Sequence, residues 1–382
     1  MSQTFYAPTR VITGNGCLGA LGMVAAGCAG RALLVCGRHA ARQSGLLDRA
    51  VGYLADAGVD ATVFDGIHGE ATLAQVDAGI DAACEANCGL LIGLGGGSAI
   101  DAAKAIAGLV RQPGSVYEYH DGRSLEESGL PMIAVPTTSG TGAEVTKNAV
   151  LINERSGLKQ SIRGDDWFPR VAIVDPETTV SMPPQVTANT GADALCQAIE
   201  AYTSIGASPV TDALAMRSIA LIGQGLTAAH ADGEDLAARE RMSMGSLLAG
   251  MAMASARLGG VHGMAHPLGS RYAIPHGLVC GLLLPYTMAY NLAFATRKYA
   301  QVGQLLGEMT GHLTPEAAAE RAVERVRAIL VKVGIPEHLG PLGLREDDYD
   351  AIIAASLPSG SLKHNPRPLA AEDVRCILSA AM

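Results

Sequence analysis

Three histidines within one short segment are the residues of this sequence most able to do chemistry. His262 and His266 are four residues apart, which places them on one face of a helix, and His276 follows after a turn-rich spacer. Upstream, Asp193 and Gln197 show the same four-residue spacing. A carboxylate and several imidazoles on facing helices are the ligands that a divalent metal of the Fe or Zn type requires. A single His pair is weak evidence, but this cluster favours a metal site.

A glycine-rich turn is the second candidate site. The apolar run 90–94 leads directly into Gly96, Gly97 and Ser98, and an alanine-rich segment follows. Glycines let backbone amides approach an anion, and a helix N-terminus carries partial positive charge, so this strand, turn and helix predict a pyrophosphate site with Ser98 as the helix cap. The alternative is a tight turn in which glycine serves packing only. Asp101 would contact a ribose or nicotinamide group, or merely favour the helix dipole.

Another glycine pattern, G-x-G-x-x-G at 14–19, follows a short strand predicted at 10–13. The acidic residue expected about 20 positions further on for the ribose hydroxyls is missing. The next strand, predicted at 31–36, ends instead in Gly37 and Arg38. We therefore expect the dinucleotide phosphates to bind at the later turn.

The elements around these residues alternate between strand and helix in the first half of the chain. Strands are predicted at 10–13, 31–36, 60–65, 90–94, 132–136 and 171–175, with helices near 42–57 and 72–86 and a hairpin between 149 and 164. Such alternation predicts a parallel sheet covered by helices. After Pro183 almost every segment indicates helix, apart from a short strand near 278–284. The fold class is therefore α/β, with a Rossmann-like parallel-sheet domain at 1–180 and an all-helical domain at 181–382.

Composition excludes several classes of protein. The 382 residues are long enough for two domains, and the net charge of −9 without a basic run argues against nucleic acid or an anionic membrane as a partner. The N-terminus lacks the pattern of a signal peptide, and we find no uninterrupted apolar run of membrane-spanning length. Eight scattered cysteines indicate buried free thiols in a reducing cytoplasm.

Seven motifs in this order resemble the iron-containing (group III, metal-dependent) alcohol dehydrogenase family, which is related in fold to dehydroquinate synthase. The resemblance covers essentially the whole chain. The matching segments are GGGSAIDAAKAIA (95–107), PTTSGTGAEVT (136–146), VDPETT (174–179), TGADALCQAIEAY (190–202), VHGMAHPLG (261–269), IPHG (274–277) and NPRP (365–368).

The resemblance implies the cofactors and the residues that bind them. NAD(P) would bind to the first domain, its pyrophosphate on Gly96, Gly97 and Ser98. Other residues implied around the cofactor are Asp101, Thr137, Thr138, Thr146 and Lys159. A divalent metal, Fe²⁺ or Zn²⁺, would be held by Asp193, position 197, His262 and His276. His266 would lie beside a small alcohol or aldehyde substrate and pass its proton to solvent. The family also implies a homodimer.

Two features of the sequence depart from the family pattern. Gln197 stands where the family has His, so we expect weaker metal binding, a changed metal preference, or loss of the metal. Gly37 and Arg38 stand where many NAD-preferring members carry Asp, and Arg38 could pair with a 2′-phosphate, which favours NADP(H).

Several cations occupy positions where the family usually has small or neutral residues. They are Arg163, Arg257, Lys363 and His364, of which Arg257 lies five residues before His262. These groups would suit a substrate carrying a carboxylate, phosphonate or sulfonate. Ordinary surface cations are the alternative.

The interpretation is reversible hydride transfer between an alcohol and NAD(P), assisted by a metal. Three alternatives stay open. A metal-free site would suit a carbonyl reductase resembling the maleylacetate reductases. A dehydroquinate synthase-like lyase would show no net redox change. A binding protein without catalysis would retain only the dinucleotide.

Overall fold

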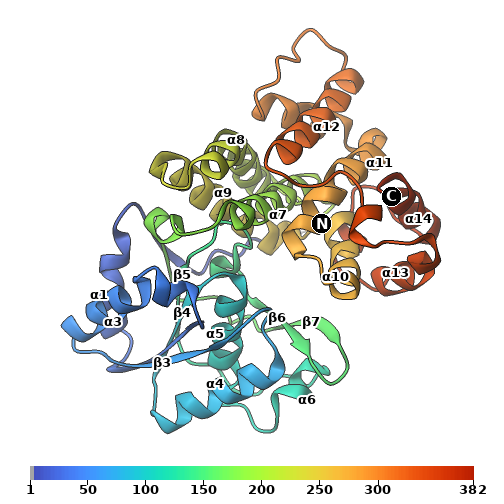
Figure 1. Ribbon diagram of the computed structural model, residues 1–382. Coiled ribbons are helices and arrows are strands. Elements are labelled where there is room, and N and C mark those ends of the chain that lie inside the picture. The colour runs from blue at the N-terminus through green and yellow to red at the C-terminus, as the bar shows by residue number, and fades with distance from the viewer. Residues whose placement is uncertain (1–3) are drawn as a thin grey trace. The chain divides into compact units, whose positions relative to one another are not determined.

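The computed structural model describes residues 4–382, which form two compact units. One unit combines Ala7–Thr138 with Gly142–Met182 and contains the sheets. The other contains Ser139–Thr141, Pro183–Met382 and residues at the start of the chain, and it is built from helices. Figure 1 shows the elements of each unit.

The first unit is organised around a parallel sheet, as the sequence predicted. Its strand order is β1 (Arg10–Thr13), β8 (Val171–Val174), β5 (Met132–Pro136), β4 (Leu90–Gly95), β2 (Arg31–Gly37) and β3 (Asp60–Ile67). The central strands are apolar throughout because both of their faces are covered. Leu33 and Val35 belong to one hydrophobic cluster, whereas Leu34 and Cys36 belong to the other.

Helices cover both faces of this sheet. Helices α4 (Leu73–Glu85) and α5 (Gly97–Leu109) pack on one face, and α1 (Leu21–Ala26) and α3 (Leu46–Asp56) pack on the opposite face (Figure 1). The predicted helix at 42–57 is interrupted, because Gly45 takes a left-handed φ of 73° between α2 (Ala40–Gln43) and α3. The hairpin is β6 (Asn148–Asn153) and β7 (Leu158–Arg163), and α6 (Val116–His120) is a short helix.

The strand order reverses direction between β2 and β4. From β2 the chain moves outward to β3 at the edge of the sheet, and it then returns to place β4 on the other side of β2. Ligands of open α/β sheets bind in the crevice outside the carboxyl ends of the strands at such a switch point. Here those ends carry Gly37 and the turn that follows Gly95.

The second unit is helical, which confirms the prediction for this half of the chain. Its helices are α7 (Pro184–Thr203), α8 (Pro209–Ala231), α9 (Leu236–Ala256), α10 (Gly260–Tyr272), α11 (His276–Leu305), α12 (Pro315–Lys332), α13 (Tyr349–Ser356) and α14 (Ala371–Ala380). The short strand expected near 278–284 was wrong, because this segment belongs to α11. Residues Val279 to Leu284 are all buried, so they carry no helical periodicity in their hydrophobicity.

Helix α11 is the only one in residues 4–382 with the length and hydropathy of a membrane span. In this structure 61% of its most apolar window is buried. It packs against α7 and α12 as the central helix of its unit, and burial of this kind accounts for its composition.

Candidate metal centre and cofactor cradle

Helix α7 carries a stripe of polar side chains through an otherwise apolar core. Asp193, Gln197 and Glu200 follow one another at spacings of four and three residues, so they share one face of the helix, and all three are buried. Helices α10 and α11 pack against α7 and bring His262, His276 and Cys280 to this face. Buried groups of this polarity require partners, so the cluster is a candidate functional site.

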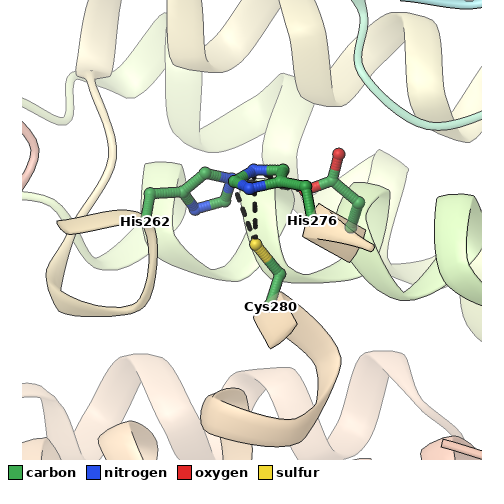
Figure 2. Close-up of side chains that lie close together, drawn as sticks. His262, His276 and Cys280 are labelled. Atoms are coloured by element: carbon green, nitrogen blue, oxygen red, sulfur yellow. Dashed lines mark hydrogen bonds and ion pairs between the residues drawn. The ribbon is translucent and has the colours of Figure 1, made fainter. Parts of the chain in front are cut away.

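Four potential ligand atoms of the cluster converge on one point. The Nε2 atom of His262 lies 3.3 Å from Oδ1 of Asp193, and Nε2 of His276 lies 3.9 Å from the same oxygen. The Cys280 sulfur is 3.5 Å from His276 Nε2 and 3.9 Å from His262 Nε2, and Figure 2 shows it pointing toward both rings. Asp193 Oδ1 nevertheless accepts no hydrogen bond from any residue between 4 and 382. A carboxylate oxygen, two imidazoles and a thiol that share one point fit a divalent cation.

Glu200 orients the His262 ring. Its Oε2 atom lies 2.6 Å from His262 Nδ1, while its Oε1 accepts the backbone N–H of Val261 at 2.7 Å. Because a carboxylate can only accept, Nδ1 carries the proton and the Nε2 lone pair faces the cluster. This is the arrangement in which an outer carboxylate holds a metal-binding imidazole.

Gln197 supports Asp193 in this structure. Its amide Nε2 donates to Asp193 Oδ2 at 3.0 Å, and its Oε1 is buried without a hydrogen-bond partner in the described chain. An amide nitrogen does not bind metals, so the side chain would have to turn over to offer its oxygen. The assignment of Gln197 as a ligand stays a prediction.

The buried groups of the cluster shift one another's pKa values. Burial opposes ionisation of Cys280, but the hydrogen bond from Cys196 and the nearby His276 and His262 rings hold the pKa of Cys280 well below its usual range. Burial also disfavours the imidazolium form, yet Cys280 raises the pKa of His276, and Cys280 with Asp193 raises that of His262. A cation in place of these protons would meet the same negative groups.

His266 lies on the more accessible side of the cluster. Its ring stacks on His276 with centroids 4.9 Å apart and an interplanar angle of 18°. The side chain of His276 is 23% exposed, whereas that of Asp193 is 4% exposed. His276 is therefore the more exposed of these two groups, and His266 lies beside it.

The predicted phosphate turn lies at the carboxyl end of β4. Gly96 is the N-cap of α5, and no side chain in the described residues caps this helix. The prediction that Ser98 caps the helix was wrong, because Ser98 lies inside its first turn. A Cβ on Gly96 would come within 3.2 Å of Thr138, so glycine permits the loop to approach closely. The uncapped amides remain available to an anion.

The other predicted cofactor residues divide into accessible and buried groups. Gly37 and Thr137 are partly accessible and Arg38 is exposed. Asp101 and Thr146 are buried around Lys104, a residue for which the sequence analysis predicted no role. Lys104 Nζ donates to Thr146 Oγ1, to two backbone carbonyls and, at 3.4 Å, to Asp101 Oδ1.

Lys159 and the glycine pattern at 14–19 both interact with acidic residues of the same chain. Lys159 forms an ion pair with Glu70. At the earlier glycine pattern the carboxylate of Asp175 accepts the backbone N–H groups of Gly16 at 3.1 Å and Leu18 at 2.9 Å. An internal anion thus occupies the amides that a phosphate would need.

A sheet switch point, an uncapped helix N-terminus at its carboxyl edge and a buried cluster of potential metal ligands are together typical of one class: dinucleotide-dependent oxidoreductases that use a metal. Residues 8–176 match the model of the iron-containing alcohol dehydrogenases, and residues 187–382 match the C-terminal domain of the same family. The chain belongs to the iron-containing alcohol dehydrogenase family. It is an enzyme that interconverts alcohols and aldehydes or ketones, and its family implies NAD(P) and a divalent metal.

Known relatives agree with this assignment. A 1,3-propanediol dehydrogenase from Klebsiella pneumoniae is 38% identical over 89% of this chain and 88% of that protein. The crystal structure of a 1,3-propanediol oxidoreductase superposes with a TM-score of 0.96 at 36% identity and covers 100% of both chains. A sulfoacetaldehyde reductase from Bifidobacterium kashiwanohense, in complex with NAD⁺, superposes with a TM-score of 0.91 at 29% identity, covering 100% of this chain and 99% of that one.

Proposed function

We propose that this enzyme oxidises small alcohols, and reduces the corresponding aldehydes or ketones, at a divalent metal held by Asp193, His262 and His276. The convergence of their free ligand atoms on one buried point is the observation that carries the proposal. A metal bound there supplies a Lewis acid for the alcohol or carbonyl oxygen.

The residues of the chain have distinct roles in this proposal. Asp193 supplies negative charge to the cation, and Glu200 fixes the His262 ring in the binding orientation. His266, on the accessible side of His276, exchanges the substrate's hydroxyl proton with solvent, for which an imidazole is suited near neutral pH.

The cofactor binds at the carboxyl edge of the sheet in this proposal. The uncapped N-terminus of α5 receives the pyrophosphate at Gly96, Gly97 and Ser98. Arg38 is exposed directly after Gly37 at the end of β2, where the adenosine ribose of a dinucleotide binds in doubly wound sheets. The Arg38 guanidinium in this position would pair with the 2′-phosphate of NADP(H), so we propose NADP(H) as the favoured cofactor.

Arg257 supports an anionic substrate. It ends α9 with a left-handed φ of 68° and is exposed, five residues before His262. A non-glycine residue in this conformation is uncommon, and such strain is concentrated at functional positions. The structural relative named for sulfoacetaldehyde shows that this fold accommodates an enzyme for an anionic aldehyde. Small aldehydes that carry a carboxylate, sulfonate or phosphonate are the class to test.

A reductase that uses no metal is the second candidate, and Gln197 favours it because the family has His at this position. In that case His266 and Arg257 would polarise the carbonyl. A cytoplasmic location and a homodimer complete the proposal, both resting on the resemblance to the family.

Elemental analysis of protein purified without added metal tests the proposal, together with assays of NADPH and NADH oxidation on neutral and anionic aldehydes. We expect bound Fe or Zn, and activity that a chelator removes and metal restores. Metal-free protein that oxidises NADPH regardless of chelator would support the metal-independent reductase. Dinucleotide binding without turnover would contradict both.

A further inference from the structure

The metal site lacks one donor if only the three ligands named in the proposed function are counted. Asp193, His262 and His276 supply three ligand atoms, whereas Gln197 turns its amide nitrogen toward Asp193. Cys280 lies one helical turn after His276 on the same face of α11, and its side chain is fully buried. Of the eight cysteines in the chain, it is the one whose sulfur contacts Nε2 of both histidines.

Two of the separations between the ligand atoms match those of a tetrahedral site, and two others are a few tenths of an ångström longer. Metal–ligand bonds of about 2.0–2.1 Å to nitrogen and oxygen and about 2.3 Å to sulfur place tetrahedral neighbours roughly 3.3–3.6 Å apart. His262 Nε2 and Asp193 Oδ1 are 3.3 Å apart, and His276 Nε2 and Cys280 Sγ are 3.5 Å apart. The two cross distances, from His262 to Cys280 and from His276 to Asp193, are each 3.9 Å. All four atoms lie within 4.8 Å of one another.

A neighbouring group of Cys196, Glu200 and His262 does not meet this criterion. His262 Nδ1 lies 2.6 Å from Glu200 Oε2, which is a hydrogen-bond distance and too short for two ligands of one ion. The Cys196 sulfur is 3.8 Å from the same Nδ1, whose proton is engaged with Glu200. Cys196 is therefore an outer neighbour of the site.

We propose that Cys280 is a metal ligand and takes the place that Gln197 leaves open. The inference deepens the proposed function, because it concerns the same cation. The carboxylate of Asp193 and the thiolate of Cys280 together carry two negative charges, which balance a divalent ion bound also by two neutral imidazoles. A site with one carboxylate and three neutral donors would keep one positive charge. Sulfur is a soft donor, so the site favours zinc over iron(II) more strongly than a nitrogen and oxygen site does.

Spectroscopy with cobalt(II) tests the ligand without relying on activity. The full-length protein is stripped with a chelator under reducing conditions and titrated with cobalt chloride. We expect one equivalent to bind with a strong near-ultraviolet band from charge transfer between thiolate and cobalt. Cys280→Ser should lose this band, and its zinc affinity should fall by more than about 100-fold, beyond the usual cost of losing an outer-shell group.

Cys196→Ser is the matched control, because it removes a second buried thiol next to His262 but should retain the band. X-ray absorption at the zinc edge of the unaltered protein gives a readout that does not depend on how the variants fold. It should show one sulfur at about 2.3 Å. Stoichiometric metal without a sulfur neighbour, or a band that persists in Cys280→Ser, would overturn the proposal. A protein that shows the band but no turnover would retain Cys280 as a ligand and contradict the proposed function instead.

Discussion

Glu200 Oε2 and His262 Nδ1 form a 2.6 Å hydrogen bond between two helices, with both side chains almost completely buried. The bond fixes the tautomer of His262, so that its Nε2 lone pair faces Asp193 and Cys280. The orientation of a ligand of the proposed metal site thus depends on a residue that is not itself one of the proposed ligands.

Glu200→Gln should weaken metal binding by about 10- to 100-fold, because an amide holds the ring less firmly and adds no negative charge. Competition with a chromophoric chelator measures the change. Glu240→Gln, at an exposed position of α9, is the control and should have no effect. Equal affinities of Glu200→Gln and the unaltered protein would contradict this role.

Gln197→Ala distinguishes a supporting residue from a ligand. If Gln197 only donates to Asp193, as in the structure, its loss should lower metal affinity by about 10-fold, the value of one hydrogen bond to a charged group. His276→Ala should lower it far more. Losses of equal size in the two variants would show that Gln197 is a ligand, as the sequence predicted.

Arg38→Ala should raise KM for NADPH by about 10-fold and leave KM for NADH unchanged, because one charge-assisted interaction with the 2′-phosphate is lost. Steady-state kinetics with both cofactors measure the difference. Arg31→Ala is the matched control, since Arg31 begins the strand that Arg38 follows. A similar change for both cofactors would assign Arg38 another role.

Glu144 makes the stability of the sheet unit depend on pH. Burial raises its pKa from 4.5 to about 7, against the opposing charge of Lys104 and with some contribution from Asp101. The folded state therefore binds the proton more tightly than the unfolded state, and stability falls as pH rises from about 4.5 to about 7. In Glu144→Gln, the fall in the free energy of unfolding over this pH range should be smaller by about 3 kcal/mol. Thermal unfolding at pH 5 and pH 8 measures it, with the exposed Glu127→Gln as the control.

Lys104→Met should destabilise the same unit by about 3–5 kcal/mol, because Asp101 would remain buried without its cation. The double variant with Asp101→Asn should recover part of this loss. Denaturant unfolding of the three variants gives the comparison, and additive losses would show that the two groups are not coupled.

The sequence was informative wherever local chemistry decides structure. Buried parallel strands such as 90–94 are continuous apolar runs, and the glycine-rich turn after them has few alternative roles. The fully buried start of α11 was misread as a strand because it lacks periodicity. Cys280 lies four residues after His276, which was a usable signal, although scattered cysteines in apolar segments are usually inert. The contacts of Glu200 and Lys104 depend on residues far away in the chain, so spacing alone did not predict them.

Helices α7, α10 and α11 each contribute to the proposed cation site, and the residues proposed as its ligands are separated by up to 87 residues. An ion that binds only the folded chain stabilises it by mass action, by about 4 kcal/mol at a thousandfold excess over Kd. If the site binds an ion, the stability of the helical unit depends on the concentration of free metal. A shortage of metal would reduce the amount of this enzyme through unfolding and proteolysis as well as through lost catalysis.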